Sequence, residues 1–269
     1  MTRPRLTLTL VPALGVLLLT AACGSGSSVG GAAAGASPAV SGGVSGTVTV
    51  FAAASLKEAF SAIGTAFESA HPGVRVVLNF GPSSGLATSI TQGNPADVFA
   101  SASPSNMDAV VKAGDATNPS TFARNQMEIV VPVSNPAQVR GLADLARRGV
   151  KVALCQAQVP CGKVAAQVFA RAGIDVVPIS QETDVKAVLT KVSLGEVDAG
   201  VVYVTDVRAA APGGKVTGIE IPAAVNASTT YPVAALTKAP NPSGAAAFTA
   251  FVLSGAGRSA LTSAGFAAP

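Results

Sequence analysis

The segment from Gly81 to Gly85 is the first place in the chain where side chains could carry out covalent chemistry. It reads Gly-Pro-Ser-Ser-Gly and so fits Gly-x-Ser-x-Gly, the pattern around the nucleophilic serine of α/β-hydrolases. That fold places its acid and then its histidine after the serine, yet the only histidine, His71, precedes Ser83. The order of these residues therefore argues against a Ser–His–acid hydrolase.

Phosphate chemistry is the next possibility, because Gly162-Lys163 resembles the end of a phosphate-binding P-loop. Such a loop needs a glycine five residues before Gly162 and a Ser or Thr after the lysine, but the chain has Ala157 and Val164 there. Nucleic acid is also a poor partner. The 269 residues contain no Trp and no cluster of Lys and Arg with aromatic side chains.

Four places where a strand is expected to run into a helix offer a different chemistry, the binding of an anion. The first N–H groups of a helix are free and lie at the positive end of its dipole, so they attract negative charge. For Ser55 the spacing by itself favours a simpler role, because Glu58 lies three residues later and completes a helix capping box. The repetition of this geometry favours anion binding instead, although the pattern does not say which places converge; they are centred on 55, 81–85, 160–162 and 183–185.

The elements that must position these residues alternate between short β-rich runs and helical patterns. This alternation predicts an α/β protein with parallel strands and a ligand site at their carboxyl ends. The expected strands are 47–53, 74–80, 97–100, 128–133, 150–154, 176–179, 200–204 and 219–221. The expected helices are 56–70, 85–91, 104–113, 141–147, 162–172, 185–194 and 206–210, with one or two closing helices in 242–265.

The N-terminal 22 residues are predicted to be a secretory signal peptide. Arg3 and Arg5 precede an apolar run that is too short for a stable membrane span, and small residues follow it. The sequence before Cys23 resembles a bacterial lipoprotein processing site, so we expect Cys23 to be lipidated. Thr20 departs from the usual Leu at its place, which leaves ordinary cleavage and a free Cys23 as the alternative. Residues 23–46 would then form the anchor and a flexible Gly/Ser/Ala-rich tether.

Export also decides how the other two cysteines are interpreted. Paired thiols oxidise outside the cell, so we expect a disulfide between Cys155 and Cys161. A metal site is the competing interpretation, but His71 is far away in sequence and no second cysteine pair exists. Without the signal peptide the chain keeps 16 Lys and Arg against 14 Asp and Glu, a nearly balanced charge.

Several segments together look like the periplasmic molybdate-binding proteins of ABC transporters. These are Phe-Ala-Ala-Ala-Ser-Leu at 51–56, the stretch 80–87, Pro-Ala-Asp-Val-Phe-Ala-Ser-Ala at 95–102, and Gly-Val-Val-Tyr-Val-Thr-Asp at 200–206. The resemblance extends from about Thr47 to the C-terminus. It implies a two-lobed, type II periplasmic-binding-protein fold with mixed, mostly parallel sheets and the ligand in the cleft between the lobes. It also implies a monomer without enzymatic activity or cofactor, and a membrane permease as partner.

The resemblance also implies which residues bind the oxyanion, all of them neutral hydrogen-bond donors. The two serines correspond to Ser55 and Ser83, with Ser84 as the alternative to Ser83. The tyrosine corresponds to Tyr203. Two backbone N–H groups correspond to Val185 and Cys161, and a difference in loop length leaves Gly162 or a neighbour of Pro160 as alternatives to Cys161.

On this basis we expect high-affinity binding of molybdate, and also of tungstate, outside the cytoplasmic membrane. The alternatives are a receptor for sulfate or another small oxyanion and, last, an enzyme that depends on Ser83. Lobe 1 is expected to comprise 47–124 and 232–269, and lobe 2 to comprise 125–231, with crossing strands at 125–126 and 231–232. We further expect Asp97 to bond to backbone, Asp206 to cap a helix, and three lysines to be solvated: Lys57, Lys163 and Lys186.

Overall fold

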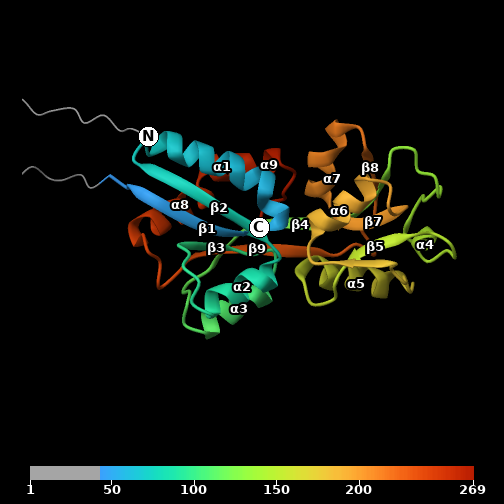
Figure 1. Ribbon diagram of the computed structural model, residues 1–269, viewed down its shortest axis with the longest axis horizontal. Helices are drawn as coiled ribbons and strands as arrows, with labels where there is room; N and C mark the ends of the chain where they lie inside the picture. The colour runs from blue at the N-terminus through green and yellow to red at the C-terminus, as the bar shows by residue number, and fades with distance from the viewer. Residues whose placement is uncertain (1–42) are drawn as a thin grey trace, which may run out of the picture. The chain divides into compact units, whose positions relative to one another are not determined.

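A computed structural model describes residues 43–269 of the chain. The predicted signal peptide, Cys23 and most of the predicted tether lie outside this range. The structure is a two-lobed α/β fold, and its strands follow the order β2-β1-β3-β9-β4-β7-β5-β6, with β8 also paired to β4. Figure 1 shows the elements in two groups, joined through β4 and β9.

The first group is a sheet with helices on both faces. Its strands are β1 (Gly46–Ala53), β2 (Val74–Gly81), β3 (Val98–Ala100), β9 (Ser228–Ala235) and the first half of β4 (Ser120–Pro132). β1 runs parallel to β2 and β3, whereas β9 is antiparallel to β3 and β4. The helices are α1 (Lys57–Ala70), α2 (Ser83–Thr91), α3 (Pro104–Lys112), α8 (Pro242–Leu253) and α9 (Gly255–Ser263).

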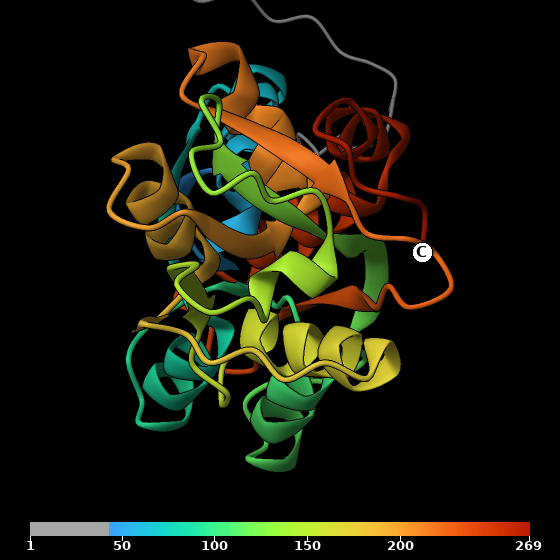
Figure 2. The ribbon, with the colours of Figure 1, turned by 90° about the vertical axis from the view of Figure 1, so that its right-hand side faces the viewer.

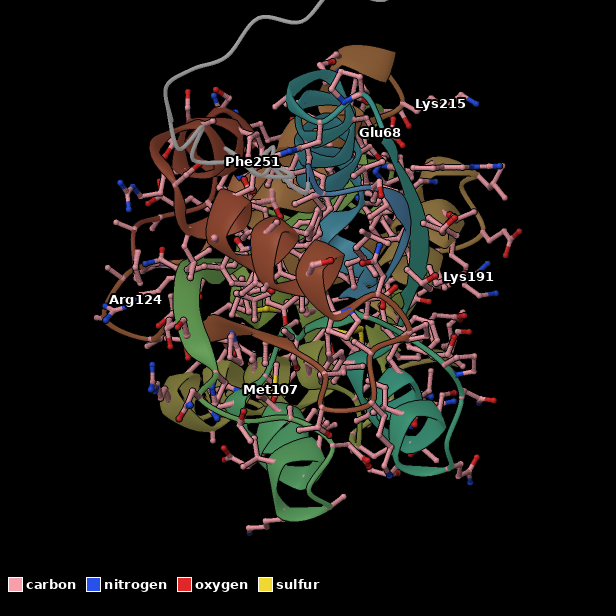
Figure 3. All side chains as sticks on the ribbon, turned by 90° about the vertical axis from the view of Figure 1, so that its left-hand side faces the viewer. Glu68, Met107, Arg124, Lys191, Lys215 and Phe251 are labelled. Carbon is pink, nitrogen blue, oxygen red and sulfur yellow. A yellow bond between two sulfur atoms is a disulfide. The ribbon has the colours of Figure 1, made fainter. Side chains whose placement is uncertain are left out.

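The side chains of this sheet alternate between two cores, as the two-residue period of a strand requires. On β1, Val48 and Val50 pack into the larger core together with α1, α8 and α9. Phe51 points to the opposite face and packs against the smaller core, which includes Met107 of α3. Figure 3 labels Met107 on α3 and Phe251 on α8, which lie in these two different layers.

The second group is built in the same way. Its strands are β5 (Val152–Cys155), β6 (Ser180–Glu182), β7 (Ala199–Tyr203), β8 (Val216–Glu220) and the second half of β4. Figures 1 and 2 show α5 (Pro160–Ala172) on one face of these strands, and α6 (Val185–Ser193) and α7 (Val204–Ala210) on the other. The short helix α4 (Leu142–Leu145) lies beside them, and one continuous apolar core fills this group.

β4 belongs to both groups. It pairs with β9 up to Gln126 and with β7 and β8 from Met127 or Glu128 onward, at the place where the sequence predicts a crossing strand. Only 128–133 was expected to be a strand. The residues of β4 before it are mostly polar, and Phe122, Ala123 and Met127 do not make a clear alternating pattern, so their pairing to β9 depends on the tertiary fold.

The strand expected at 176–179 is wrong, since β6 forms at Ser180–Glu182 instead. Val177 and Ile179 are exposed, and Pro178 has no N–H group to donate to a neighbouring strand. The role expected of Asp97 is confirmed. Its carboxylate accepts hydrogen bonds from the N–H groups of Thr49 at 2.7 Å and Asn241 at 2.6 Å, and so joins β3 to β1 and to the start of α8.

Within residues 43–269, none of the helices combines the length and the apolar character needed to cross a membrane.

Candidate functional site

All five residues expected to bind the ligand line a single pocket. Its cavity volume is about 20 Å³, far below the range of roughly 300–1,000 Å³ that is usual for larger organic ligands. The pocket is therefore of a size for a small ligand. It is lined by Ala53, Ala54, Ser55, Gly81, Pro82, Ser83, Ala102, Val159, Pro160, Cys161, Thr183, Asp184, Val185 and Tyr203.

The pocket lies where strands end and helices begin. From the first group come the 3-10 turn Ala54–Leu56 after β1, the start of α2 after β2, and Ala102 after β3. From the second come the starts of α5 and α6 and the end of β7. Parallel strands bring their carboxyl ends to one edge of a sheet, and this edge is where α/β proteins bind ligands.

Ser83 is the first residue of α2 and is 1% exposed. Its Oγ accepts a hydrogen bond of 3.0 Å from the N–H group of Ala102. A serine hydroxyl has one proton and two lone pairs, so this bond leaves the proton free to be donated. Ser83 is thus prepared to act as a donor toward the pocket.

Ser55 does not cap a helix, so the capping box expected with Glu58 is wrong. Its side chain makes no capping bond, and its Oγ lies 2.9 Å from the Oη of Tyr231. Glu58 turns to Lys186 instead, and its carboxylate accepts hydrogen bonds of 2.8 and 2.9 Å from the lysine Nζ. The local spacing suggested a cap, but Ser55 and Glu58 instead make hydrogen bonds to residues distant in the sequence.

Tyr203 is the last residue of β7 and is 1% exposed. Among the residues that the structure describes, its Oη has no hydrogen-bond partner. Burial raises the pKa of Tyr203 well above its ordinary value, and the nearby Tyr231 and Asp206 add to this effect. The hydroxyl therefore stays protonated, and a buried donor without a partner is what a ligand would satisfy.

The start of α6 supplies a backbone donor. The side chain of Asp184 caps this helix by accepting hydrogen bonds from the N–H groups of Lys186 at 2.9 Å and Ala187 at 3.1 Å. The N–H group of Val185, the first residue of α6, is not among the groups that this cap satisfies, and a first helical residue has no partner within its helix. It is thus available to a ligand.

The start of α5 supplies the matching donor on the other side. Cys161 is the second residue of α5 and is joined to Cys155, at the end of β5, by the disulfide expected from the sequence. A side chain at Gly162 would overlap the carbonyl group of Gln156, so only glycine fits this close approach. The disulfide and this contact hold the loop 156–160 against the first turn of α5.

Lys186 is not a solvated side chain, and that expectation is wrong. Its Nζ lies 2.8 Å from Oε2 of Glu58 and 2.9 Å from Oδ1 of Asp206. Asp206 is fully buried; burial raises its pKa, and Lys186 opposes this change. Asp206 also accepts a 3.2 Å hydrogen bond from the N–H group of Tyr203 at the start of α7, the capping role expected of it. We call the side chains of Glu58, Lys186 and Asp206 the charged bridge.

The chemistry available in the pocket is hydrogen-bond donation by neutral groups. No Lys, Arg or His lines it, and Lys57 and Lys163 are exposed as expected. Ser83 therefore has no histidine base beside it in the pocket. Within residues 43–269, no three His, Cys, Asp or Glu side chains are grouped so that they could hold a metal ion. The arrangement suits an anion that accepts hydrogen bonds and donates none.

Sequence comparison assigns the chain to a family. Residues 48–267 match the family described as bacterial extracellular solute-binding protein. The chain belongs to this family. The molybdate-binding protein ModA of Mycobacterium tuberculosis is 45% identical to it over 224 residues, which is 83% of this chain and 85% of that protein.

Solved structures show the same fold for this solute-binding protein. The periplasmic molybdate-binding protein of Azotobacter vinelandii matches with a TM-score of 0.73 at 19% identity, over 82% of this chain and 99% of that one. The sulfate-binding protein SubI of Mycobacterium tuberculosis also has a TM-score of 0.73, at 20% identity over 82% and 86% of the two chains.

Four residues around the pocket were missed by the sequence interpretation: Ala102, Asn125, Thr205 and Tyr231. Ala102 and Tyr231 contact the pocket serines, and Asn125 contacts Thr205 and Tyr231. All four come from distant parts of the chain, so no local pattern groups them. Tyr231 was expected only as part of a crossing strand. Its one sequence signal is that the chain has just two tyrosines, and this signal does not point to Ser55.

Proposed function

We propose that the chain binds molybdate, and also tungstate, and delivers it to the membrane permease of an ABC importer. The single observation that carries this proposal is the pocket between the strand ends, where Ser83, Tyr203 and Val185 offer donors without a competing basic side chain. The 45% identity to a molybdate-binding protein favours this anion. In the proposed site Ser55, Ser83 and Tyr203 donate through hydroxyl groups, and Cys161 and Val185 through their N–H groups.

The donor set favours anions that carry no proton. Molybdate, tungstate and sulfate are fully deprotonated near neutral pH and only accept hydrogen bonds, whereas monohydrogen phosphate also needs an acceptor. Asp184 is the one carboxylate at the pocket, and its Oδ1 is occupied by two N–H groups of α6. Each hydrogen bond to the dianion contributes about 1.5 to 3 kcal/mol, which offsets the cost of removing the anion from water.

Sulfate is the alternative ligand, because it is also a tetrahedral dianion and the fold is shared with a sulfate-binding protein. Size then has to distinguish the two, since the metal–oxygen bonds of molybdate are longer than the sulfur–oxygen bonds of sulfate. Tungstate has nearly the size of molybdate, so we expect the two to bind comparably.

Delivery requires that the protein act outside the cytoplasm, as its family does. We propose that it is monomeric and anchored to the membrane through a lipid on Cys23. The lobes are taken as residues 47–124 with 232–269, and residues 125–231, and the cleft closes over the anion by rotation about β4 and β9. A role as an enzyme is not proposed, because no histidine lines the pocket beside Ser83 and the carboxylate of Asp184 is engaged in capping α6.

Thermal unfolding of residues 47–269 with equal concentrations of molybdate, tungstate, sulfate or phosphate tests the ligand. A ligand present at 100 times its dissociation constant stabilises the fold by about 2.7 kcal/mol, which raises the midpoint of a chain of this size by roughly 5 to 10 °C. We expect a shift with molybdate and tungstate. A shift with sulfate alone would assign the site to sulfate, and no shift with any of the four would overturn oxyanion binding.

A further inference from the structure

We infer that Tyr231 and Asn125 are positioning residues that fix the direction of the Ser55 hydroxyl, so that it donates its proton to the bound anion. This role rests on the proposed anion-binding function. It extends the site beyond the residues that line the pocket to a chain of hydrogen bonds behind Ser55, made by residues of β9 and β4.

Tyr231 lies on β9, is fully buried, and has its Oη 2.9 Å from the Oγ of Ser55. The geometry of this bond alone allows either oxygen to be the donor. The two possibilities differ in their consequence. If Ser55 donated to Tyr231, it would turn lone pairs toward a dianion and repel it, whereas if Ser55 accepts, its proton is free for the anion.

Asn125 decides between these possibilities. Its Oδ1 accepts a 3.0 Å hydrogen bond from the N–H group of Gln126, so its Nδ2 must be the atom on the other side. From there Nδ2 lies 2.8 Å from the Oγ1 of Thr205 and 3.5 Å from the Oη of Tyr231. An amide nitrogen only donates, so Tyr231 is the acceptor in its contact with Asn125. This contact is the longest of the hydrogen bonds that lead to Ser55.

The proton of Tyr231 then has one place to go. Within residues 43–269 the Oη of Tyr231 has hydrogen bonds of proper geometry to Ser55 and Asn125 alone; the Tyr203 hydroxyl is near enough to affect the pKa of Tyr231 but is not aligned to bond with it. Since Asn125 cannot accept, Tyr231 donates to Ser55. All donors thus point the same way, from Asn125 through Tyr231 and Ser55 to the anion, and such chains strengthen each bond by polarisation.

Ser83 provides an internal comparison. Its Oγ accepts from the N–H group of Ala102, a backbone donor that cannot reverse its direction. Ser55 has no such backbone donor on its Oγ, and Tyr231 takes this position with a side chain. Burial raises the pKa of the Tyr231 hydroxyl, which keeps it protonated and able to donate.

The test is a double-mutant cycle of Tyr231→Phe and Ser55→Ala, with molybdate affinity measured by titration calorimetry. The phenylalanine keeps the ring, which packs edge-on against Phe122, Tyr203 and Phe266. We expect Tyr231→Phe to weaken molybdate binding about tenfold in the wild type and less than about twofold in the Ser55→Ala background, because its effect passes through Ser55.

The preference between molybdate and phosphate is a second measurement, and it would not change if Tyr231 had only a structural role. In Tyr231→Phe the Ser55 hydroxyl is free to accept, so monohydrogen phosphate should displace molybdate at a lower concentration than in the wild type. Thr249→Val is the matched control, since it too removes one buried hydroxyl, in this case one on α8 that has no hydrogen-bond partner among the described residues. It should change neither the affinity nor the preference.

An equal loss in both backgrounds, or no loss with unchanged phosphate displacement, would overturn the role of Tyr231. Asn125→Ala is the second variant if Tyr231→Phe does not fold, and it should weaken binding about threefold only when Ser55 is present. Failure of the proposed function itself is distinguishable, because the wild-type protein would then give no heat with molybdate.

Discussion

The pocket and the charged bridge lie side by side, and both connect elements of the two groups. The pocket offers the neutral hydroxyls of Ser83 and Tyr203, and the bridge holds Lys186 between the carboxylates of Glu58 and Asp206. The pocket is neutral and the bridge is charged because the negative charge at the pocket comes from the ligand, whereas that of the bridge belongs to the protein. A buried charge needs a partner, so the fully buried Asp206 is paired within the chain, whereas the proposed ligand of the pocket brings its own charge.

The comparison also explains why a lysine stands so close to the pocket without lining it. Asp206 is near enough to Tyr203 to contribute to its raised pKa, so its negative charge is felt at the pocket. Lys186 compensates that charge and is itself held 2.9 Å from Asp206. The bridge thus keeps an acidic residue from opposing an anion, while the donors remain neutral.

The largest expected effect comes from removing the cation of the bridge. Lys186→Met leaves Asp206 buried and unpaired, which should reduce the free energy of unfolding by about 3 to 5 kcal/mol and also weaken molybdate binding. Urea denaturation measures the first effect. Asp206→Asn in the same chain should recover much of the loss, and Lys163→Met, at an exposed lysine, should cost little. A small loss for Lys186→Met would place the pair among weak surface ion pairs.

The next effect concerns the pocket itself. Tyr203→Phe removes one donor and keeps the ring, so molybdate affinity should fall by about 2 kcal/mol. Stability without ligand should not fall, because the hydroxyl has no partner in the described residues. Titration calorimetry and unfolding of the free protein separate the two quantities. A loss of affinity below about 1 kcal/mol would mean that Tyr203 only fills the core.

A smaller effect is expected from reducing the disulfide between Cys155 and Cys161. Reduction frees the loop before α5, so the Cys161 N–H group must be ordered on binding, at a cost of about 0.5 to 1.5 kcal/mol in affinity. The measurement is molybdate titration with thiols counted before and after reduction. The double variant Cys155→Ser/Cys161→Ser should match the reduced protein, and unchanged affinity after complete reduction would contradict the prediction.

The smallest effect is a dependence on alkaline pH. Burial lowers the pKa of Lys186, but the nearby carboxylates of Asp206 and Glu58 favour the charged form and raise it by more, so the net shift is upward. A raised pKa in the folded state stabilises the protein below the unfolded pKa of about 10.4, and this contribution is lost as pH rises through the folded value. Lys186→Arg stays charged, so the wild type should lose stability relative to this variant above that pH. Parallel curves would contradict the shift.

Much of the fold could be predicted from local sequence. Apolar spacing predicted α1, α3 and α6 to within one or two residues, and the strands β1, β2 and β7 likewise. β4 and β6 were predicted poorly. Residues 120–126 of β4 are mostly polar, with only Phe122 and Ala123 in the core, and they become a strand because β9 lies beside them. β6 forms after the apolar residues Val177 and Ile179, which remain exposed.

By itself the sequence determined which residues stand at the ends of strands and the starts of helices, because capping residues, glycines and apolar periods are local signals. The resemblance to molybdate-binding proteins, and not these local signals, implied that Ser55, Ser83, Cys161, Val185 and Tyr203 face a ligand, and the structure brings all five to one pocket. Only the tertiary structure decided what stands behind them. The contacts of Ser55 with Tyr231 and of Lys186 with Glu58 join residues more than 100 positions apart, and no local pattern encodes such a pairing.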